Sequence, residues 1–227
     1  MITIEEYFGD WIKVIDKQEL CKVINTLDIF YNKIPICPDK KDVFKAFDLC
    51  SLNNLKVVFL GQDPYPQKGV ATGILFGNKS DVLEDDLSPS LQIIKRACID
   101  YTIPHNNIKF DHTLESWSKQ GILMINSALT CERNVIGSHV MLWRPFIAKL
   151  LYNLSNSYQG IIYVLFGNKA QTFTPYINTN SNDIIKIEHP AWFARTNKEM
   201  PNTLFKDINV LLKNKYGTTI KWYEEIE

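Results

Sequence analysis

The sequence has no long hydrophobic run, no closely spaced pair of cysteines and no excess of charge of either sign. No apolar segment approaches the roughly 20 residues that a membrane-spanning helix needs, and the amino terminus lacks the basic-then-apolar pattern of a secretory signal. The 227-residue chain has a formal net charge of +0, so a surface for an anionic partner must be a local patch balanced by acid elsewhere. We therefore expect a cytoplasmic protein without a membrane partner.

The five cysteines lie far apart, at Cys21, Cys37, Cys50, Cys98 and Cys131. None belongs to a C-x-x-C pair, so their spacing favours neither a zinc ribbon nor an iron–sulfur cluster. An odd count without a secretory signal is typical of reduced thiols that pack as small apolar side chains. We therefore expect no metal site and no bound cofactor.

The length and a hydrophobic content of 45% are typical of one globular domain with a sizeable core. Apolar residues recur at helical spacing in three segments before residue 50, which are Ile4–Ile15, Leu20–Ile29 and Val43–Leu49. We expect residues 1–50 to form a helical cap on a core made of residues 51–227.

Four short apolar runs predict buried strands: Leu55–Leu60, Ile122–Ile125, Ile161–Phe166 and Ile184–Ile187. They lack polar alternation, as parallel strands covered on both faces do. Helical patterns lie between them, at Ser90–Cys98 and at Pro145–Leu154, where the proline is expected at the first helical position. Strands alternating with helices predict a three-layer α/β/α fold with a central, four-stranded, mostly parallel sheet.

Each predicted strand ends in a segment that could carry function. These segments are Gly61–Pro66, Asn126, Gly167-Asn168 and His189-Pro190. Ligands bind outside the carboxyl ends of the strands in open parallel sheets, so we expect the four segments to meet at one crevice. Within the first, two prolines flank a tyrosine and stiffen the loop, which would hold the carboxylate of Asp63 in a fixed position. Taken alone, the same fragment is also typical of a rigid turn.

The segment Gly61–Tyr65 resembles the water-activating loop of family 1 uracil-DNA glycosylases. The match continues in order through five further segments: Thr72–Phe76, Ser88–Leu91, Trp117–Asn126, Leu165–Gln171 and His189-Pro190. One such fragment would be weak evidence, but the ordered set is specific. The resemblance implies an enzyme that hydrolyses the bond between uracil and deoxyribose in DNA and leaves an abasic site, as in base excision repair.

The resemblance also implies roles for individual residues. Asp63 would orient the attacking water and favour positive charge on the sugar, while a neutral His189 would donate to uracil O2. Asn126 would pair with O4 and N3–H of uracil and so reject cytosine. Phe76 would stack on the base, and Tyr65 would exclude the methyl group of thymine. Gln62 would complete the substrate-binding set.

A base inside a duplex must be extruded before it can enter such a pocket. By resemblance, the residues that contact DNA are Ser88, Pro89, Ser90, Gly167, Asn168, Pro190, Ala191, Trp192, Phe193 and Arg195. Phe193 matches the family's intercalating wedge by position, and Trp192 could share that task. No lysine lies in the loop of residues 61–66, so a covalent intermediate and strand cleavage are not expected.

Two departures from the family pattern stand out. Pro66 replaces the histidine that usually closes the first loop, although proline also occurs there in the poxvirus branch of the family. Ala191 and Trp192 replace a serine and a proline, which removes one phosphate contact and makes the wedge bulkier. These changes leave the reaction intact and put strand preference and turnover in question.

Two other functions stay open on the sequence alone. One is a DNA-binding accessory protein of replication or processivity, with weak or no glycosylase activity. The other is a nucleotide-binding α/β enzyme, but neither G-x-G-x-x-G nor G-x-x-x-x-G-K-[ST] occurs. The expected partner is single- or double-stranded DNA that contains uracil. The family resemblance adds a protein inhibitor that mimics DNA, and the chain is expected to act as a monomer.

Overall fold

A computed structural model describes residues 3–99 and 107–226. In this part of the chain, four parallel strands form the central sheet: β2 (Val57–Gly61), β4 (Ile122–Asn126), β6 (Ile162–Phe166) and β7 (Asp183–Ile187). They lie in the order β4-β2-β6-β7, and every neighbouring pair is parallel. The prediction of an α/β fold around a four-stranded parallel sheet is therefore confirmed.

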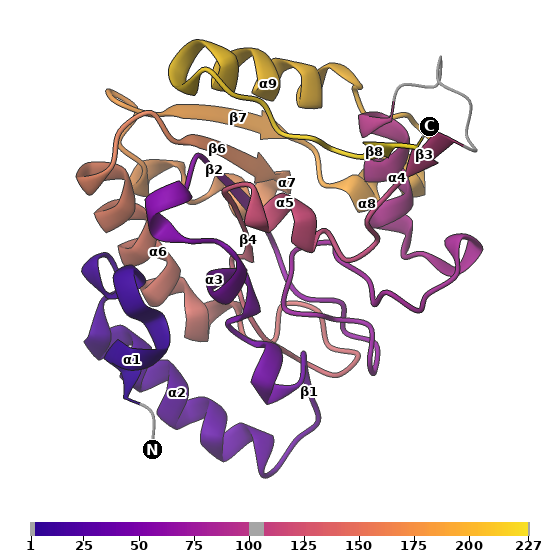
Figure 1. Ribbon diagram of the computed structural model, residues 1–227. Coiled ribbons are helices and arrows are strands. Elements are labelled where there is room, and N and C mark those ends of the chain that lie inside the picture. Colours follow the sequence, from indigo (N-terminus) through magenta and orange to yellow (C-terminus); the bar gives the residue numbers. More distant parts are fainter. Residues whose placement is uncertain (1–2, 100–106, 227) are drawn as a thin grey trace.

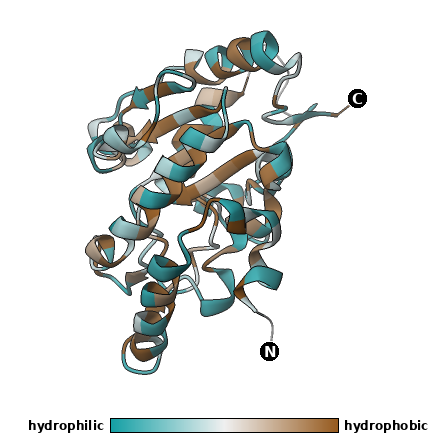
Figure 2. Ribbon diagram, turned by 90° about the vertical axis from the view of Figure 1, so that its left-hand side faces the viewer, coloured by the Kyte–Doolittle hydropathy of each residue, from teal (hydrophilic) through white to brown (hydrophobic). Residues whose placement is uncertain are grey.

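Helices cover both faces of the sheet (Figure 1). Helix α9 (Thr203–Tyr216) lies on one side, and α6 (Val140–Ser157) and α2 (Lys17–Tyr31) lie on the other. Three strands are fully buried along their length, whereas β7, at the sheet edge, is only partly covered. In Figure 2 the strands carry hydrophobic residues, and hydrophilic residues lie on the outer turns of the helices. No helix among the described residues is long and apolar enough to cross a membrane.

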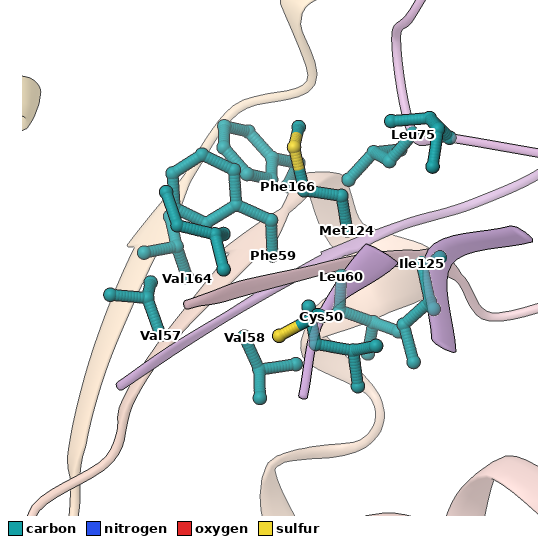
Figure 3. Packing of buried hydrophobic residues seen from close by; sticks show 14 of the residues in the cluster. Cys50, Val57, Val58, Phe59, Leu60, Leu75, Met124, Ile125, Val164 and Phe166 are labelled. Carbon is teal, nitrogen blue, oxygen red and sulfur yellow. The ribbon is translucent and has the colours of Figure 1, made fainter. Parts of the chain in front are cut away.

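The core is built from side chains that alternate between the two faces of the sheet. Phe59, Met124 and Phe166 lie on one face, and Val58 and Leu60 lie on the other (Figure 3). All five are at most 1% exposed. The rings of Phe59 and Phe166 pack edge to face at 5.2 Å, a favoured aromatic arrangement.

The amino-terminal residues form helical turns, as their spacing predicts. They comprise α1 (Ile4–Phe8), a 3-10 segment (Gly9–Lys13), α2 and α3 (Lys45–Leu49). A capping box between Thr3 and Glu6 begins α1, and the side chain of Asp16 caps α2. Four shorter helices lie nearer the functional segments: α4 (Pro89–Cys98), α5 (Glu115–Lys119), α7 (Gly167–Gln171) and α8 (Pro190–Thr196).

Two small antiparallel pairs flank the main sheet. Strand β1 (Ile36–Cys37) pairs with β5 (Cys131–Glu132), and β3 (Ile108–Lys109) pairs with β8 (Glu224–Glu225). The first pair lies beside the segments that follow β2 and β4, so it bears on the functional site below.

The predicted start of one helix is wrong. Helix α6 begins at Val140, and Pro145 lies inside it rather than at its first position. Proline removes one backbone N–H and is costly inside a helix. Here Trp143, Phe146 and Ile147 are fully buried on the same helix, so their packing outweighs the missing hydrogen bond.

Candidate active site

The carboxyl ends of the four strands share one edge of the sheet, and a cavity of about 320 Å³ opens there. Ten residues predicted from the sequence line it: Gln62, Asp63, Tyr65, Phe76, Pro89, Ser90, Asn126, His189, Ala191 and Arg195. They come from the end of β4, from the segments that follow β2 and β7, and from the helices α4 and α8. The structure therefore brings together side chains that are far apart in sequence.

Asp63 is half-buried in this cavity. Its Oδ2 accepts a hydrogen bond of 2.8 Å from the side-chain amide of Gln62, while its Oδ1 is buried without a hydrogen-bond partner among the described residues. Burial raises the pKa of Asp63, and Gln62, the nearby backbone N–H of Gly137 and the charge of Lys169 act in the opposite direction. An unpaired acceptor beside other polar side chains of the cavity lining, such as those of Asn126 and His189, is suited to hold a water molecule.

The loop that carries Asp63 is held by backbone hydrogen bonds from the segment after β4. The N–H groups of Ser127 and Ala128 donate to the carbonyls of Gly61 and Gln62, at 3.1 and 3.0 Å. Further along, the N–H of Asn134 donates to the carbonyl of Pro66 at 3.0 Å. The loop is thus fixed at both ends, which keeps the carboxylate in place without a histidine at position 66.

Asn126 ends β4 and is 8% exposed. Its Oδ1 is buried and has no hydrogen-bond partner in the described residues. Gly61 lies directly opposite in the sheet register, and a Cβ there would lie 2.8 Å from Asn126 Oδ1 and 2.3 Å from Leu75 Cδ1. Glycine at position 61 therefore leaves the space that the amide of Asn126 occupies at the cavity wall.

His189 directly precedes α8 and caps its start: its Nδ1 accepts a hydrogen bond of 3.1 Å from the N–H of Ala191. Because Nδ1 accepts, the proton of the neutral ring is on Nε2, which is left as a donor. Burial and then the charge of Arg195 lower the pKa of His189 to about 4, so the ring is neutral at pH 7. Gly167 leaves room for the His189 side chain, because a Cβ at position 167 would lie only 2.9 Å from His189 Cβ.

Phe76 is 5% exposed and has a φ of 64°, which is rare for an aromatic residue. Its ring packs against His189 at 5.4 Å and against Phe166 at 5.2 Å. The strained backbone at Phe76 is held by the packing around it. On one side, the hydroxyl of Thr72 donates to the carbonyl of Gly77 at 3.3 Å.

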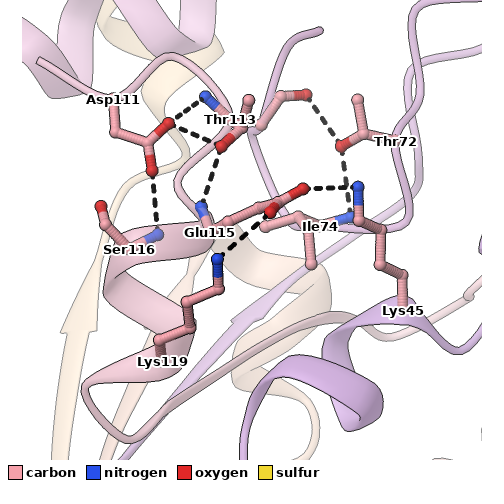
Figure 4. A network of polar contacts seen from close by, with 9 residues as sticks. Lys45, Thr72, Ile74, Asp111, Thr113, Glu115, Ser116 and Lys119 are labelled. Carbon is pink, nitrogen blue, oxygen red and sulfur yellow. Dashed lines mark hydrogen bonds and ion pairs between the residues drawn. The ribbon is translucent and has the colours of Figure 1, made fainter. Parts of the chain in front are cut away.

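A polar network lies beside Thr72 and Ile74, which precede Phe76 in the chain (Figure 4). Asp111 accepts hydrogen bonds from Thr113 and Ser116, and Glu115 pairs with Lys45 at 2.6 Å. The N–H of Asn78 donates to the carbonyl of His112 at 2.9 Å, which joins the two segments. The bond from Asn78 thus holds the end of this segment against the residues that precede α5.

Tyr65 is fixed through its hydroxyl group. The hydroxyl lies 2.6 Å from Ser88 Oγ and 3.3 Å from the carbonyl oxygen of Phe76. Ser88 Oγ is also 3.1 Å from Oδ1 of the buried Asn78. Burial raises the pKa of Tyr65 to about 12, against the effect of hydrogen bonds with Ser88 and Ser90. The Tyr65 ring therefore has little freedom to move away from the cavity.

The remaining predicted site residues lie outside the cavity lining: Ser88, Gly167, Asn168, Pro190, Trp192 and Phe193. The Ser88 hydroxyl bonds to the protein itself, Gly167 and Pro190 are buried, and Asn168 is exposed. Trp192 is half-buried, and the ammonium group of Lys198 lies 5.0 Å from the centre of its ring.

Phe193, which matches the family's intercalating wedge by position, is buried in this structure. Phe193 is 7% exposed and belongs to the hydrophobic core. The segment that follows His189 is the helix α8, which packs closely against α4, so that Phe193 faces inward. In this conformation the Phe193 ring is covered by protein, and its role as the wedge stays a prediction.

Four apolar residues that no sequence motif indicates also line the cavity. Ile136, between β5 and α6, lines the cavity although it belongs to no motif, and Leu129, Val43 and Ala71 do so as well. No signal in the sequence separates these from ordinary apolar residues. For Ile136, the nearby Gly137, with a φ of +79°, indicates only a turn.

The chain is similar to known proteins over most of its length. The model of the Uracil DNA glycosylase superfamily matches residues 47–213. The chain is 32% identical over 222 residues to the uracil-DNA glycosylase of Mesomycoplasma hyopneumoniae (strain 7448), covering 97% of each chain. It is 31% identical over 225 residues to that of Fusobacterium nucleatum, covering 96% of each chain.

Solved structures share the fold. The crystal structure of mimivirus uracil-DNA glycosylase superposes with a TM-score of 0.73 at 23% identity, covering 96% of this chain and 91% of that one. A variant of mimivirus UNG in complex with UGI gives 0.73 at 25% identity, covering 98% and 95%. None of these relatives is a poxvirus protein, so the likeness of Pro66 to that branch stays a prediction.

The protonation state of His189 can be measured directly. We expect its ring to titrate with a midpoint near 4, because burial penalises the charged imidazolium. An Arg195→Gln variant should raise this midpoint only slightly, since burial is the larger cause. NMR titration of the histidine ring signals tests both statements. A midpoint near the ordinary 6.5 in the folded protein would contradict them.

Proposed function

The chain belongs to the uracil-DNA glycosylase superfamily, and we propose that it hydrolyses the bond between uracil and deoxyribose in DNA. This makes it an N-glycosyl hydrolase of base excision repair. One observation carries the proposal above all: Asp63, Asn126 and His189 line a single cavity at the carboxyl edge of the sheet.

The roles follow from where charge develops in the reaction. When the N-glycosidic bond breaks, positive charge builds on the sugar and negative charge on the departing base. Ionised Asp63 favours the first, and its unpaired Oδ1 accepts a hydrogen bond from the water that attacks C1′. The Nε2–H of neutral His189 donates to uracil O2 as negative charge grows there. Uracil leaves as an anion, and the proton of the attacking water passes to Asp63.

Base recognition rests on Asn126 and the two aromatic walls. The amide of Asn126 offers one donor and one acceptor, which match O4 and N3–H of uracil, and cytosine presents the opposite pattern. A mismatched base would leave buried polar groups unpaired, which can give discrimination of ~10⁴-fold or more. Phe76 stacks on the base, and Tyr65 excludes the methyl group of thymine.

The substrate must reach the cavity as an extruded nucleotide. Pro89, Ser90, Ala191 and Arg195 line the cavity and are suited to contact the DNA backbone near the extruded base. We further propose that Asn168 and the amides of α7 contribute phosphate contacts, and that the enzyme is monofunctional because the loop of residues 61–66 has no lysine.

The mimivirus UNG variant was solved in complex with UGI, and we propose that a protein inhibitor that mimics DNA can occupy the same surface here. We also propose a monomer that works in the cytoplasm, as a single domain of residues 1–227 with a helical cap at residues 1–50. The free thiols of all five cysteines fit a reducing compartment.

The activity is tested with an oligonucleotide that contains a single uracil, in excess EDTA. We expect release of uracil in EDTA, because no step of the proposed reaction uses a metal. Single- and double-stranded DNA should both serve, because the cavity takes an extruded nucleotide from either.

The two residues with the clearest roles can be tested by substitution. Asp63→Asn should lower kcat by about 10²–10⁴-fold, and Asn126→Asp should shift release towards cytosine. Asp81→Asn, which changes an exposed aspartate, serves as the matched control.

One result would overturn the proposal, and a second would then identify the alternative. If uracil stays intact after long incubation with stoichiometric protein, the chain is no glycosylase. Duplex binding that persists in Asp63→Asn and Asn126→Ala without any base release would then favour the alternative, a DNA-binding accessory protein.

The contact between Ser88 and Tyr65 predicts a second specificity effect. Tyr65→Ala should admit thymine, because it removes the wall that faces the methyl group. Ser88→Ala should raise the ratio of thymine to uracil release by roughly fivefold, the worth of one neutral hydrogen bond that restrains the ring. If Ser88 also contacts a DNA phosphate, the loss of that contact lowers thymine and uracil release equally, so the ratio of the two is unaffected. Ser80→Ala, at an exposed position of the same segment, is the control; an unchanged ratio in Ser88→Ala would mean that Ser88 does not restrain Tyr65.

A further inference from the structure

The mouth of the cavity has an exposed apolar side chain that no family motif accounts for. Ile136 is 69% exposed, and it lines the cavity together with Asp63 and His189. Its neighbour Val135 is also exposed, whereas the expected wedge, Phe193, is buried. A large aliphatic side chain at the mouth of a cavity remains in water until something covers it.

The segment that carries Ile136 is held in one shape. The N–H of Arg133 donates to the carbonyl of Pro35 at 2.8 Å, and that of Val135 donates to the carbonyl of Glu132 at 3.0 Å. The Ser138 hydroxyl accepts a hydrogen bond of 2.7 Å from the N–H of Glu132. These bonds close the turn between β5 and α6, so Ile136 projects from a fixed backbone.

The same turn contacts the loop that carries the carboxylate. The N–H of Asn134 donates to the carbonyl of Pro66, and the N–H of Gly137 lies close enough to Asp63 to lower its pKa. Ile136 lies between these two contacts in sequence. It therefore belongs to the side of the cavity where Asp63 acts, and in the proposed reaction Asp63 acts on the sugar rather than on the base.

We propose that Ile136 packs against the deoxyribose of the nucleotide that enters the cavity and closes the side of the site next to Asp63. This inference rests on the proposed function. The sugar presents C–H groups that an aliphatic side chain can cover, and covering them removes apolar surface of both partners from water. The same contact separates Asp63 and its bound water from bulk solvent.

The test is Ile136→Ala, with kcat/KM for uracil release measured on single-stranded and duplex DNA. We expect a fall of about tenfold on both, because the entering nucleotide has a sugar in either case. Inhibition by free uracil, which has no sugar, should be unchanged. Ile136→Leu should restore most of the activity. Met141→Ala, 78% exposed and outside the cavity lining, is the matched control.

Three outcomes would overturn the inference. These are a kcat/KM of Ile136→Ala within about twofold of the wild type, a loss confined to duplex DNA, and a parallel loss of inhibition by free uracil. The second would mean a contact with the flanking duplex, and the third a disturbed base pocket. Failure of the proposed function is distinguished by the wild-type protein, which would then release no uracil in the same assay.

Discussion

The close approach of β2 and β4 at their carboxyl ends is the constraint on which the site depends. Gly61 and Asn126 are register partners there, and no side chain fits at position 61 without displacing the Asn126 amide or Leu75. This approach sets the Asn126 amide at the wall of the cavity and starts the loop that carries Asp63 one residue later. The backbone bonds from Ser127 and Ala128 to that loop exist because the two strands end together.

A chain of aromatic contacts joins the core to the same cavity. Phe59 packs on Phe166, Phe166 on Phe76, and Phe76 on His189, with ring centres 5.2 to 5.4 Å apart. Close-packed interiors resist deformation, so these contacts limit how far the Phe76 ring can move. A site held in this way needs little reorganisation when charge develops in the reaction.

The sheet could be predicted from the sequence because its strands are continuous apolar runs. Val57–Gly61 and Ile162–Phe166 begin and end within two residues of the predicted runs, since burial on both faces leaves a clear pattern. The start of α6 could not be predicted, because the apolar face of the helix overrides the local preference of Pro145. The family resemblance supplied the candidate residues, and the structure adds their distances and burial.

Other features of the site depend on tertiary contacts that no motif encodes. The burial of Phe193 follows from how α8 packs on α4, and the bond between Ser88 and Tyr65 joins residues that are far apart in the chain. Ile136 has no distinguishing sequence pattern, and only its place at the cavity mouth marks it. The surroundings of the cavity are therefore set by tertiary packing that the motifs do not specify.

The central claim is that one cavity holds uracil between Asn126, His189 and Asp63. A crystal structure with DNA that contains a non-cleavable deoxyuridine analogue tests it most directly. The account predicts the base inside the cavity, with the Asn126 amide and His189 Nε2 at hydrogen-bond distances of about 2.7–3.2 Å from its edge, and a water on Asp63 Oδ1. A base bound outside the cavity, or one that makes no contact with Asn126, would contradict it.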